Sequence, residues 1–346
     1  MISARGDVYR VPPFRENPKP FASLGEGFGS SPFVIRTVNA GSGGQAGDDV
    51  WLIAASECEI KALSLTSGKI RTLSGLPSNQ KILAGNLRSG AGIEADSRHA
   101  YFFRKENGRT FLSCVDFQNH AHADLIDIED EEIAGPVLAG DLVFAWSPSR
   151  WYAAGPVTLL GARSQTCHRL WFPAGFVPVC GARGGSWGDF AGRRTCMVSD
   201  SLVHIPGQRQ GTSALFIVNA CARLSEGKVL QLRTEASCWQ GSGSAPTVTV
   251  PGRLFRAERG SLSEVMADPR IEPGHPSYSD THVSAAFVRS EGKTKLRLAL
   301  GDFATDLSLH QLSDFGRAVE ICTTGNGLML LYQDAYDETH IAACLA

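Results

Sequence analysis

The stretch VWLIAASECEIKALSLTSGKIRTL, residues 50–73, is the clearest indication of the fold in this sequence. It consists of an apolar strand pattern, a polar turn, a second strand, a Ser-Gly-Lys turn and a third strand. Residues 99–128 and 282–312 have the same organisation, with Asn107-Gly108 and Glu291-Gly292 in their first turns. Short strands that recur in units of about 40 to 50 residues are typical of a β-propeller. The sequence therefore predicts an all-β protein, a single closed β-propeller with seven blades, or six as the alternative count.

The ends of the chain suggest how such a ring closes. Residues 1–32 are rich in Pro and Gly and read as an N-terminal leader, and residues 33–346 read as the propeller. The last module, residues 318–346, supplies three strands, whereas a propeller blade has four. We expect the strand-like GDVYRV, residues 6–11, to add the fourth strand and close the ring, because an open edge promotes aggregation. In the least regular part of the chain we expect GSLSEVMADPR, residues 260–270, to form a short loop helix.

Net charge, the N-terminal sequence and the cysteines indicate which partners and which cellular compartment to expect. The formal net charge is −2 over 346 residues, so no global attraction to nucleic acid or an anionic membrane is expected. The first twenty residues contain no apolar signal-peptide core, which predicts a cytoplasmic protein. The nine cysteines are scattered and form no C-x-x-C pair, so we interpret them as reduced core residues.

The phrase IKALSLTSGKI, residues 60–70, resembles the I-x-A-L-D-x-x-T-G-K turn of quinoprotein-like repeats. The modules as a whole resemble the WD40-like and quinoprotein-like β-propeller superfamilies. They depart from both, because no module ends in Trp-Asp and no Gly-His precedes one, and the adjacent cysteine pair of quinoprotein dehydrogenases is missing. The resemblance implies a rigid platform for protein partners and no redox cofactor, so we expect no bound cofactor.

One string has the composition of a metal site. His120, His122 and Asp124 alternate along the chain, and alternate residues of a strand share a face. The H-x-H-x-D pattern is similar to the metal motif of metallo-β-lactamase-like hydrolases, but its second Asp-His step is replaced by Leu125 and Ile126. We therefore interpret the string as a polar strand edge and predict no metal, keeping these three residues as the metal candidate.

Two irregular connections carry the residue types that dominate binding hot spots. The first follows the strand LVFAW and holds Arg150 and Trp151, and the second holds Arg183, Trp187 and Arg193. We predict that these five residues contact a protein partner. The alternative for the two tryptophans is that they fill space between neighbouring blades.

The function predicted from sequence is a non-enzymatic platform for protein–protein interaction within a multiprotein assembly, with no catalytic residues. A propeller enzyme, a hydrolase or lyase with a site at the mouth of the central channel, is the first alternative. A carbohydrate-binding lectin is the second, although a lectin would repeat one aromatic and Arg set in each blade, and the turns here do not repeat.

Overall fold

The structure is a computed structural model, and the residues that it describes form an all-β chain. The described residues are 5–9, 20–28, 33–38, 49–83, 92–129, 132–155, 166–178, 197–199, 201–221, 224, 227–232, 245–258, 261–273, 275–309, 315–324, 327–334 and 339–345. They fall into two compact units, one up to Phe172 and the other from Pro173 onward. In this part of the chain the strands form seven antiparallel sheets of three to five strands and one two-stranded sheet.

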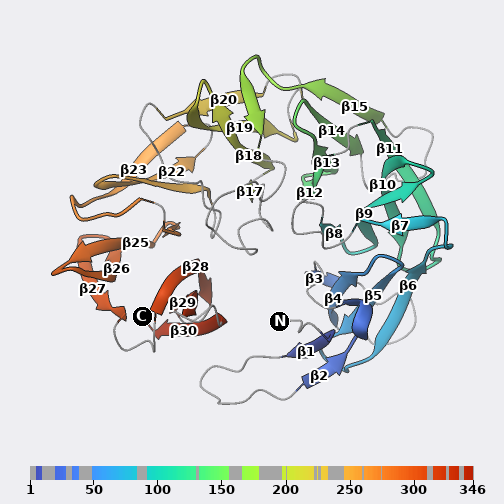
Figure 1. Ribbon diagram of the computed structural model, residues 1–346, viewed down its shortest axis with the longest axis horizontal. Helices are drawn as coiled ribbons and strands as arrows, with labels where there is room; N and C mark the ends of the chain where they lie inside the picture. The colour runs from blue at the N-terminus through green and yellow to red at the C-terminus, as the bar shows by residue number, and fades with distance from the viewer. Residues whose placement is uncertain are drawn as a thin grey trace. The chain divides into compact units, whose positions relative to one another are not determined.

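Three of the larger sheets lie in the unit up to Phe172 (Figure 1). The first and third follow the chain as meanders, and in the second both β7 and β8 pair with β9. The first contains β3 (Phe33–Val38), β4 (Asp49–Ala55), β5 (Glu59–Ser64) and β6 (Ile70–Gly75). The second contains β7 (Gln80–Ile82), β8 (Ile93–Ala95), β9 (His99–Glu106), β10 (Arg109–Asp116) and β11 (His122–Ile128). The third contains β12 (Ala134–Ala139), β13 (Leu142–Trp146), β14 (Arg150–Gly155) and β15 (Thr166–Trp171).

The unit from Pro173 onward contains the other four. They are built from β16 (Phe176–Pro178), β17 (Met197–Ser199), β18 (Leu202–Arg209), β19 (Thr212–Asn219) and β20 (Lys228–Gln231); from β21 (Thr247–Val250), β22 (Arg253–Glu258) and β23 (Ser261–Ala267); from β24 (Tyr278–Ser279), β25 (Val283–Ser290), β26 (Lys293–Leu300) and β27 (Phe303–Ser308); and from β28 (Phe315–Thr324), β29 (Gly327–Asp334) and β30 (Thr339–Leu345).

The three predicted modules are confirmed as β4–β6, β9–β11 and β25–β27. Their tight turns have the chemistry expected of two-residue hairpins. Asn107 and Gly108 have φ of 49° and 82°, and Glu291 and Gly292 have φ of 55° and 74°. A turn with two positive φ angles matches the right-handed twist of the flanking strands, and Asn-Gly is the pair that adopts it at least cost.

Apolar side chains from neighbouring sheets make the core of each unit. In the first unit, Tyr101 and Phe103 of β9 belong to one buried cluster with Val143 of β13 and Tyr152 of β14. In the second, Met266 at the end of β23 packs in a cluster that includes residues of β25. Face-to-face packing of successive sheets is how a repeat architecture buries surface that one repeat cannot bury alone.

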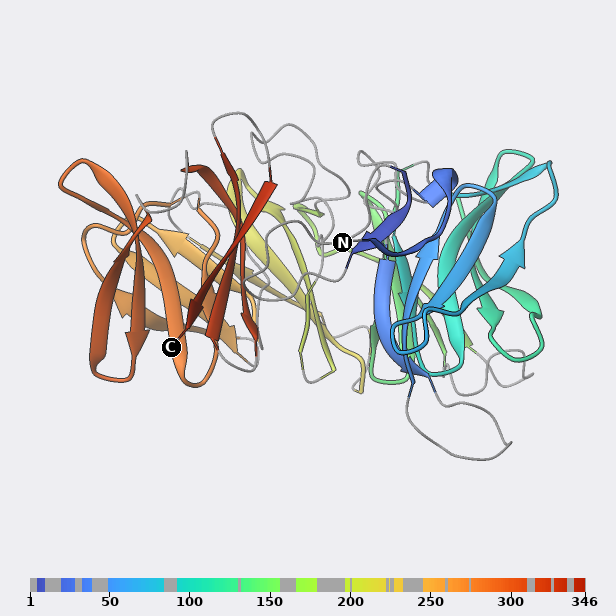
Figure 2. The same cartoon turned by 90° about the horizontal axis from the view of Figure 1, so that it is seen from below.

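The N-terminal segment forms a small sheet that packs against the sheet of β3–β6. β1 (Asp7–Tyr9) pairs with β2 (Pro20–Ser23), and the 3₁₀ turn η1 (Glu26–Phe28) follows. Figure 2 shows β1 and β2 beside the sheet of β3–β6. Their buried cluster consists of Val8, Leu24, Phe28, Leu52, Ala54 and Leu63. The expected pairing of this strand with the last module stays a prediction.

One expectation about secondary structure is wrong. Residues 261–267 form strand β23 and not a helix, and they pair with β22 from Arg253 to Glu258. The ladder supplies hydrogen bonds to a neighbour that a short isolated helix lacks, so tertiary pairing overrides the local helix signal. Among the described residues, no helix is long and apolar enough to cross a membrane.

Candidate functional site

A serine turn fixes the position of Arg150. The hydroxyl oxygen of Ser147 accepts the backbone N–H of Arg150 at 3.1 Å, and the backbone N–H of Ser147 donates to the Arg150 carbonyl at 2.8 Å. Ser and Pro favour such turns because the hydroxyl replaces a backbone acceptor and Pro148 presets φ. Arg150 is therefore the first residue of β14, held by the hairpin that joins β13 to β14.

Arg150 lies over the ring of Trp171. The two residues are partners in the β14–β15 ladder, so their side chains leave the same face of the sheet. The guanidinium carbon of Arg150 is 4.1 Å from the ring centroid, within the range of a cation–π contact. The Trp171 side chain is nevertheless 66% exposed. A large aromatic ring is thus held in one orientation at the surface.

Two guanidinium groups share one carboxylate at this position. Nη1 of Arg150 is 3.3 Å from Oε2 of Glu129, and Nη1 of Arg169 is 3.6 Å from Oε1 of the same residue. Glu129 follows β11, so the group joins the second and third sheets of the first unit. We call Glu129, Arg150, Arg169 and Trp171 the Arg150–Trp171 patch. Its ion pairs are long and solvent-exposed, and such pairs contribute about 0–1 kcal/mol each.

The neighbouring Trp151 has the opposite environment. It is 2% exposed and stacks on Phe144, with ring centroids 6.0 Å apart and planes at 19°. A buried position of this kind is expected if Trp151 fills space between neighbouring blades, which was the alternative to a partner contact. Arg183, Trp187 and Arg193, also predicted to contact a partner, lie outside the described residues, so their role stays a prediction.

The three candidate metal ligands have separate partners. His120 lies in the turn before β11 with φ of 56°, and its Nδ1 is 2.8 Å from the carbonyl oxygen of Leu73. His122 begins β11, and its Nε2 is 2.7 Å from the hydroxyl of Ser74. The two histidines therefore connect β11 to β6 of the preceding sheet.

Asp124 takes part in a different contact. Its carboxylate accepts two bonds from the Arg104 guanidinium, at 2.6 and 3.3 Å, and one from the hydroxyl of Ser113 at 2.7 Å. Arg104 also donates to Glu106 at 2.8 Å. Burial and the positive charge of Arg104 lower the pKa of His122 below 6.5. Across the part of the chain that the structure describes, no three His, Cys, Asp or Glu side chains are grouped as a metal site.

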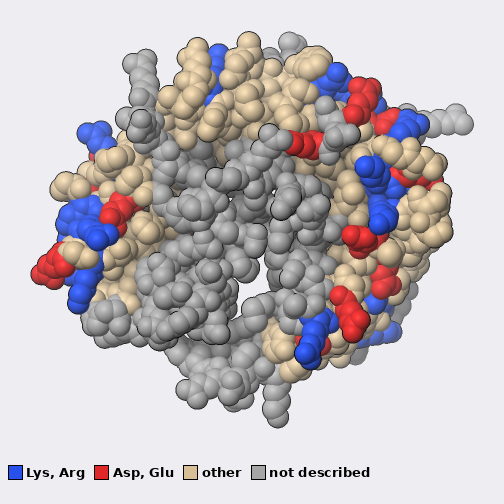
Figure 3. Space-filling model, viewed as in Figure 1, with Lys and Arg blue, Asp and Glu red and all other residues tan. Residues whose placement is uncertain are grey.

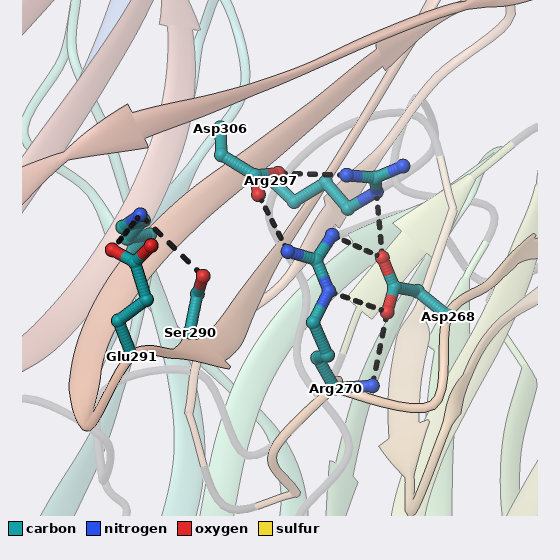
Figure 4. Close-up of polar contacts among 7 residues, drawn as sticks. Asp268, Arg270, Ser290, Glu291, Arg297 and Asp306 are labelled. Atoms are coloured by element: carbon teal, nitrogen blue, oxygen red, sulfur yellow. Dashed lines mark hydrogen bonds and ion pairs between the residues drawn. The ribbon is translucent and has the colours of Figure 1, made fainter.

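A second ionic cluster was not foreseen from the sequence. Asp268, Arg270, Arg297 and Asp306 alternate in charge around a closed ring of contacts (Figure 4). The four N–O distances are 2.7, 2.8, 3.0 and 2.7 Å. Asp268 and Arg270 lie between β23 and β24, whereas Arg297 and Asp306 lie on β26 and β27. The ring therefore joins two neighbouring sheets of the second unit, and the Asp-Pro-Arg turn is its visible trace in the sequence.

Positive and negative side chains are mixed on the face of the molecule shown in Figure 3. On this face, Lys and Arg side chains lie beside Asp and Glu side chains in small groups. This pattern agrees with the near-zero net charge. What distinguishes the Arg150–Trp171 patch is its exposed indole, and not an excess of one charge.

Comparison with solved structures identifies the type of fold. The chain is similar to a structure of dipeptidyl peptidase 4 from Porphyromonas gingivalis, at 10% identity over 91% of this chain and 52% of that one, with a TM-score of 0.55. It thus spans about half the length of that peptidase chain. A structure of the mitotic checkpoint complex matches at 9% identity over 97% of this chain and 99% of that one, with a TM-score of 0.44. A nidogen/laminin complex matches at 10% identity over 86% and 93%, with a TM-score of 0.37.

The similarity to the peptidase structure, at a TM-score of 0.55, supports the predicted β-propeller fold. At 10% identity it shows the fold alone. No protein-family model matches the sequence, and no curated protein matches it. Function must therefore be argued from the side chains of this chain.

Proposed function

We propose that the protein is a non-enzymatic β-propeller platform that binds another protein through the Arg150–Trp171 patch. One observation carries the proposal: Trp171 is largely exposed yet held in place by the stacked Arg150. Trp and Arg are enriched in binding hot spots, because they combine a large contact area with directed hydrogen bonds. A ring that is already ordered also loses little conformational entropy when a partner covers it.

The ion pairs of the patch support the same role. Glu129 is shared by two arginines at 3.3 and 3.6 Å, so neither guanidinium group has a short bidentate partner there. A partner carboxylate can therefore pair with Arg150 or Arg169 at little cost to the fold. By contrast, the cluster around Arg104 and the ring around Asp268 use their charged groups internally.

Affinity capture from the native host, followed by quantitative mass spectrometry, tests the proposal. The variant Arg150→Glu/Arg169→Glu is compared with the wild-type protein and with Arg253→Glu. Arg253 serves as the control, since its side chain is more exposed than those of Arg150 and Arg169 and its ion pair with Glu264 is 3.3 Å long, as is that of Arg150 with Glu129. We expect the double variant to recover at least about tenfold less of the bound proteins, whereas the control recovers them normally. Full recovery by a folded double variant contradicts the proposal.

We also propose that the seven larger sheets are the seven blades of one closed ring. The seven antiparallel sheets of three to five strands in the described residues support this count. In the described residues the sheet of β28–β30 has three strands, which leaves room for a closing strand. If residues 6–11 close the ring, deletion of residues 1–12 accelerates amide exchange along β30 and leaves β27 unchanged. Equal exchange along β30 before and after the deletion places the closure elsewhere.

A further inference from the structure

β15, the outer strand that carries Arg169 and Trp171 of the patch, has a regular edge. β15 is the last strand of the sheet β12–β13–β14–β15, and its six residues pair with β14 without a shift in register. Native proteins protect exposed edges with bulges or very short strands. Register shifts interrupt the ladders of the outer strands β6, β11 and β23, and β20 has four residues. β15 carries neither form of protection, and the same is true of β27 and β30, but of these three strands only β15 carries Arg169 and Trp171 of the patch.

The ladder determines which backbone groups of β15 point away from the sheet. The N–H of Phe172 donates to the carbonyl of Ser149 at 3.3 Å, toward β14. Backbone direction alternates along an antiparallel strand, so Leu170 and His168 also direct their N–H groups inward. Cys167, Arg169 and Trp171 therefore direct their N–H and C=O groups to the outer edge. Their side chains lie on the face that carries Arg150, because Arg150 pairs with Trp171.

Charge determines what can pair with this edge. Two β15 strands from separate copies, paired antiparallel at their centres, would place Arg169 of one copy opposite Arg169 of the other. Like charges directly opposite destabilise a pair of strands. A carboxylate at the same position instead meets Arg169, whose present partner is 3.6 Å away and shared with Arg150.

We propose that the partner adds an extended acidic segment to the outer edge of β15, as a fifth strand of this sheet. This inference rests on the proposed function and specifies how the patch is used. Main-chain hydrogen bonds to Cys167, Arg169 and Trp171 supply affinity in this mode, and alternate side chains supply specificity. Acidic side chains of the segment lie on the face of Arg150 and Arg169, and an apolar side chain covers Trp171.

A synthetic peptide tests the proposal directly. The probe is acetyl-Val-Thr-Glu-Thr-Glu-Thr-Val-amide, in which the valines share the face of the glutamates, and its control replaces both glutamates with lysines. Amide exchange is followed residue by residue by NMR on the full chain, at millimolar peptide. We expect the acidic peptide to slow exchange at Arg169 and Trp171 at least about fivefold, and the lysine peptide to leave it unchanged. An acidic peptide N-methylated on the amides that face β15 should give no protection, because it lacks those donors.

The variant Arg169→Glu should reverse the preference of the edge from the acidic to the lysine peptide. Unchanged exchange at Arg169 and Trp171 overturns strand addition. If the Arg150→Glu/Arg169→Glu variant still loses its captured proteins in that case, the platform stands and only its mode of binding is wrong. If exchange is unchanged and capture is also unaffected, the platform fails as well. Protection that rises with protein concentration, together with a dimer mass by light scattering, assigns the edge to a second copy and overturns the acidic segment.

Discussion

Trp151 and Trp171 lie in the same sheet, on neighbouring strands, yet one is 2% exposed and the other 66%. Trp151 is paired with Leu170, whereas Trp171 is paired with Arg150, so the two rings leave opposite faces of the sheet. Trp151 stacks on Phe144, and Trp171 has a guanidinium group on its face. The face of the strand on which a side chain lies, and the position of the strand in the sheet, therefore separate a core tryptophan from an exposed one, and residue type does not.

The largest expected effect separates these two tryptophans by stability. Trp151→Ala should lower the free energy of unfolding by about 3–5 kcal/mol, because it removes a buried ring and leaves a cavity. Trp171→Ala should change it by about 0.5 kcal/mol or less, because most of that ring is in water already. Chemical denaturation of both variants measures the difference. Equal losses would mean that Trp171 is part of the core.

A second test compares the closed ionic ring with the open patch. Asp268→Ala removes a buried carboxylate that accepts hydrogen bonds from Arg270 and forms an ion pair with Arg297. We expect a loss of about 1.5–3 kcal/mol, as for hydrogen bonds to charged groups. Glu129→Ala should cost at most about 1 kcal/mol, because its pairs are exposed. A larger loss for Glu129→Ala, measured by the same denaturation, would assign the patch a structural role.

A third test follows the pH dependence of the ionic ring formed by Asp268, Arg270, Arg297 and Asp306. The hydrogen bonds from Arg270 lower the pKa of Asp268 below 3.8 despite its burial. Burial opposes ionisation of Asp306, but the bonds from Arg297 and Arg270 outweigh it and lower its pKa below 3.8 as well. Both carboxylates therefore contribute stability that is present above about pH 3.8 and is lost as pH falls through their lower pKa values in the folded state. The stability difference between the wild-type protein and Asp306→Asn should be constant from pH 7 to pH 5 and shrink toward pH 2.5. A stability difference that is independent of pH over that range would show that Asp306 does not have a lowered pKa in the folded protein.

The smallest effect concerns the link between the first two sheets. Burial, followed by the charge of Arg104, lowers the pKa of His122 in the folded protein below 6.5. The unfolded chain then binds the proton more tightly, so this contribution is present above about pH 6.5 and is lost as pH falls through the pKa of the folded state. Between pH 7.5 and pH 5, the melting temperature of His122→Gln should fall less than that of the wild-type protein, by roughly 3 °C or less. Identical pH profiles would show that His122 titrates alike in both states.

Periodicity was sufficient to predict the strands of the three clear modules, but not strand β23 or the role of each polar side chain. Asn107-Gly108 and Glu291-Gly292 mark their hairpins because few residue pairs accept two positive φ angles. The pattern H-x-H-x-D predicted a shared strand face, but His120 lies in a turn outside β11. The strand begins at His122, two residues later than the alternation implied, and strand boundaries are the least reliable part of predictions from sequence.

The exposed tryptophan was missed for a related reason. Alternation in TCHRLW, residues 166–171, places Arg169 and Trp171 on one face, and this signal was available in the sequence. What the sequence lacks is the information that this strand is the outer one, which depends on pairing with β14 and on Glu129 from another sheet. Long-range contacts of this kind decide exposure, and local propensity does not report them.

The most direct test of the account is to measure partner affinity and melting temperature of Trp171→Ala on the same preparation. We expect Trp171→Ala to bind the captured protein at least about tenfold more weakly, because a hot-spot ring is lost, and to melt within about 2 °C of the wild-type value. Unchanged affinity in a folded Trp171→Ala variant would contradict it, because the partner would then bind a surface other than the Arg150–Trp171 patch.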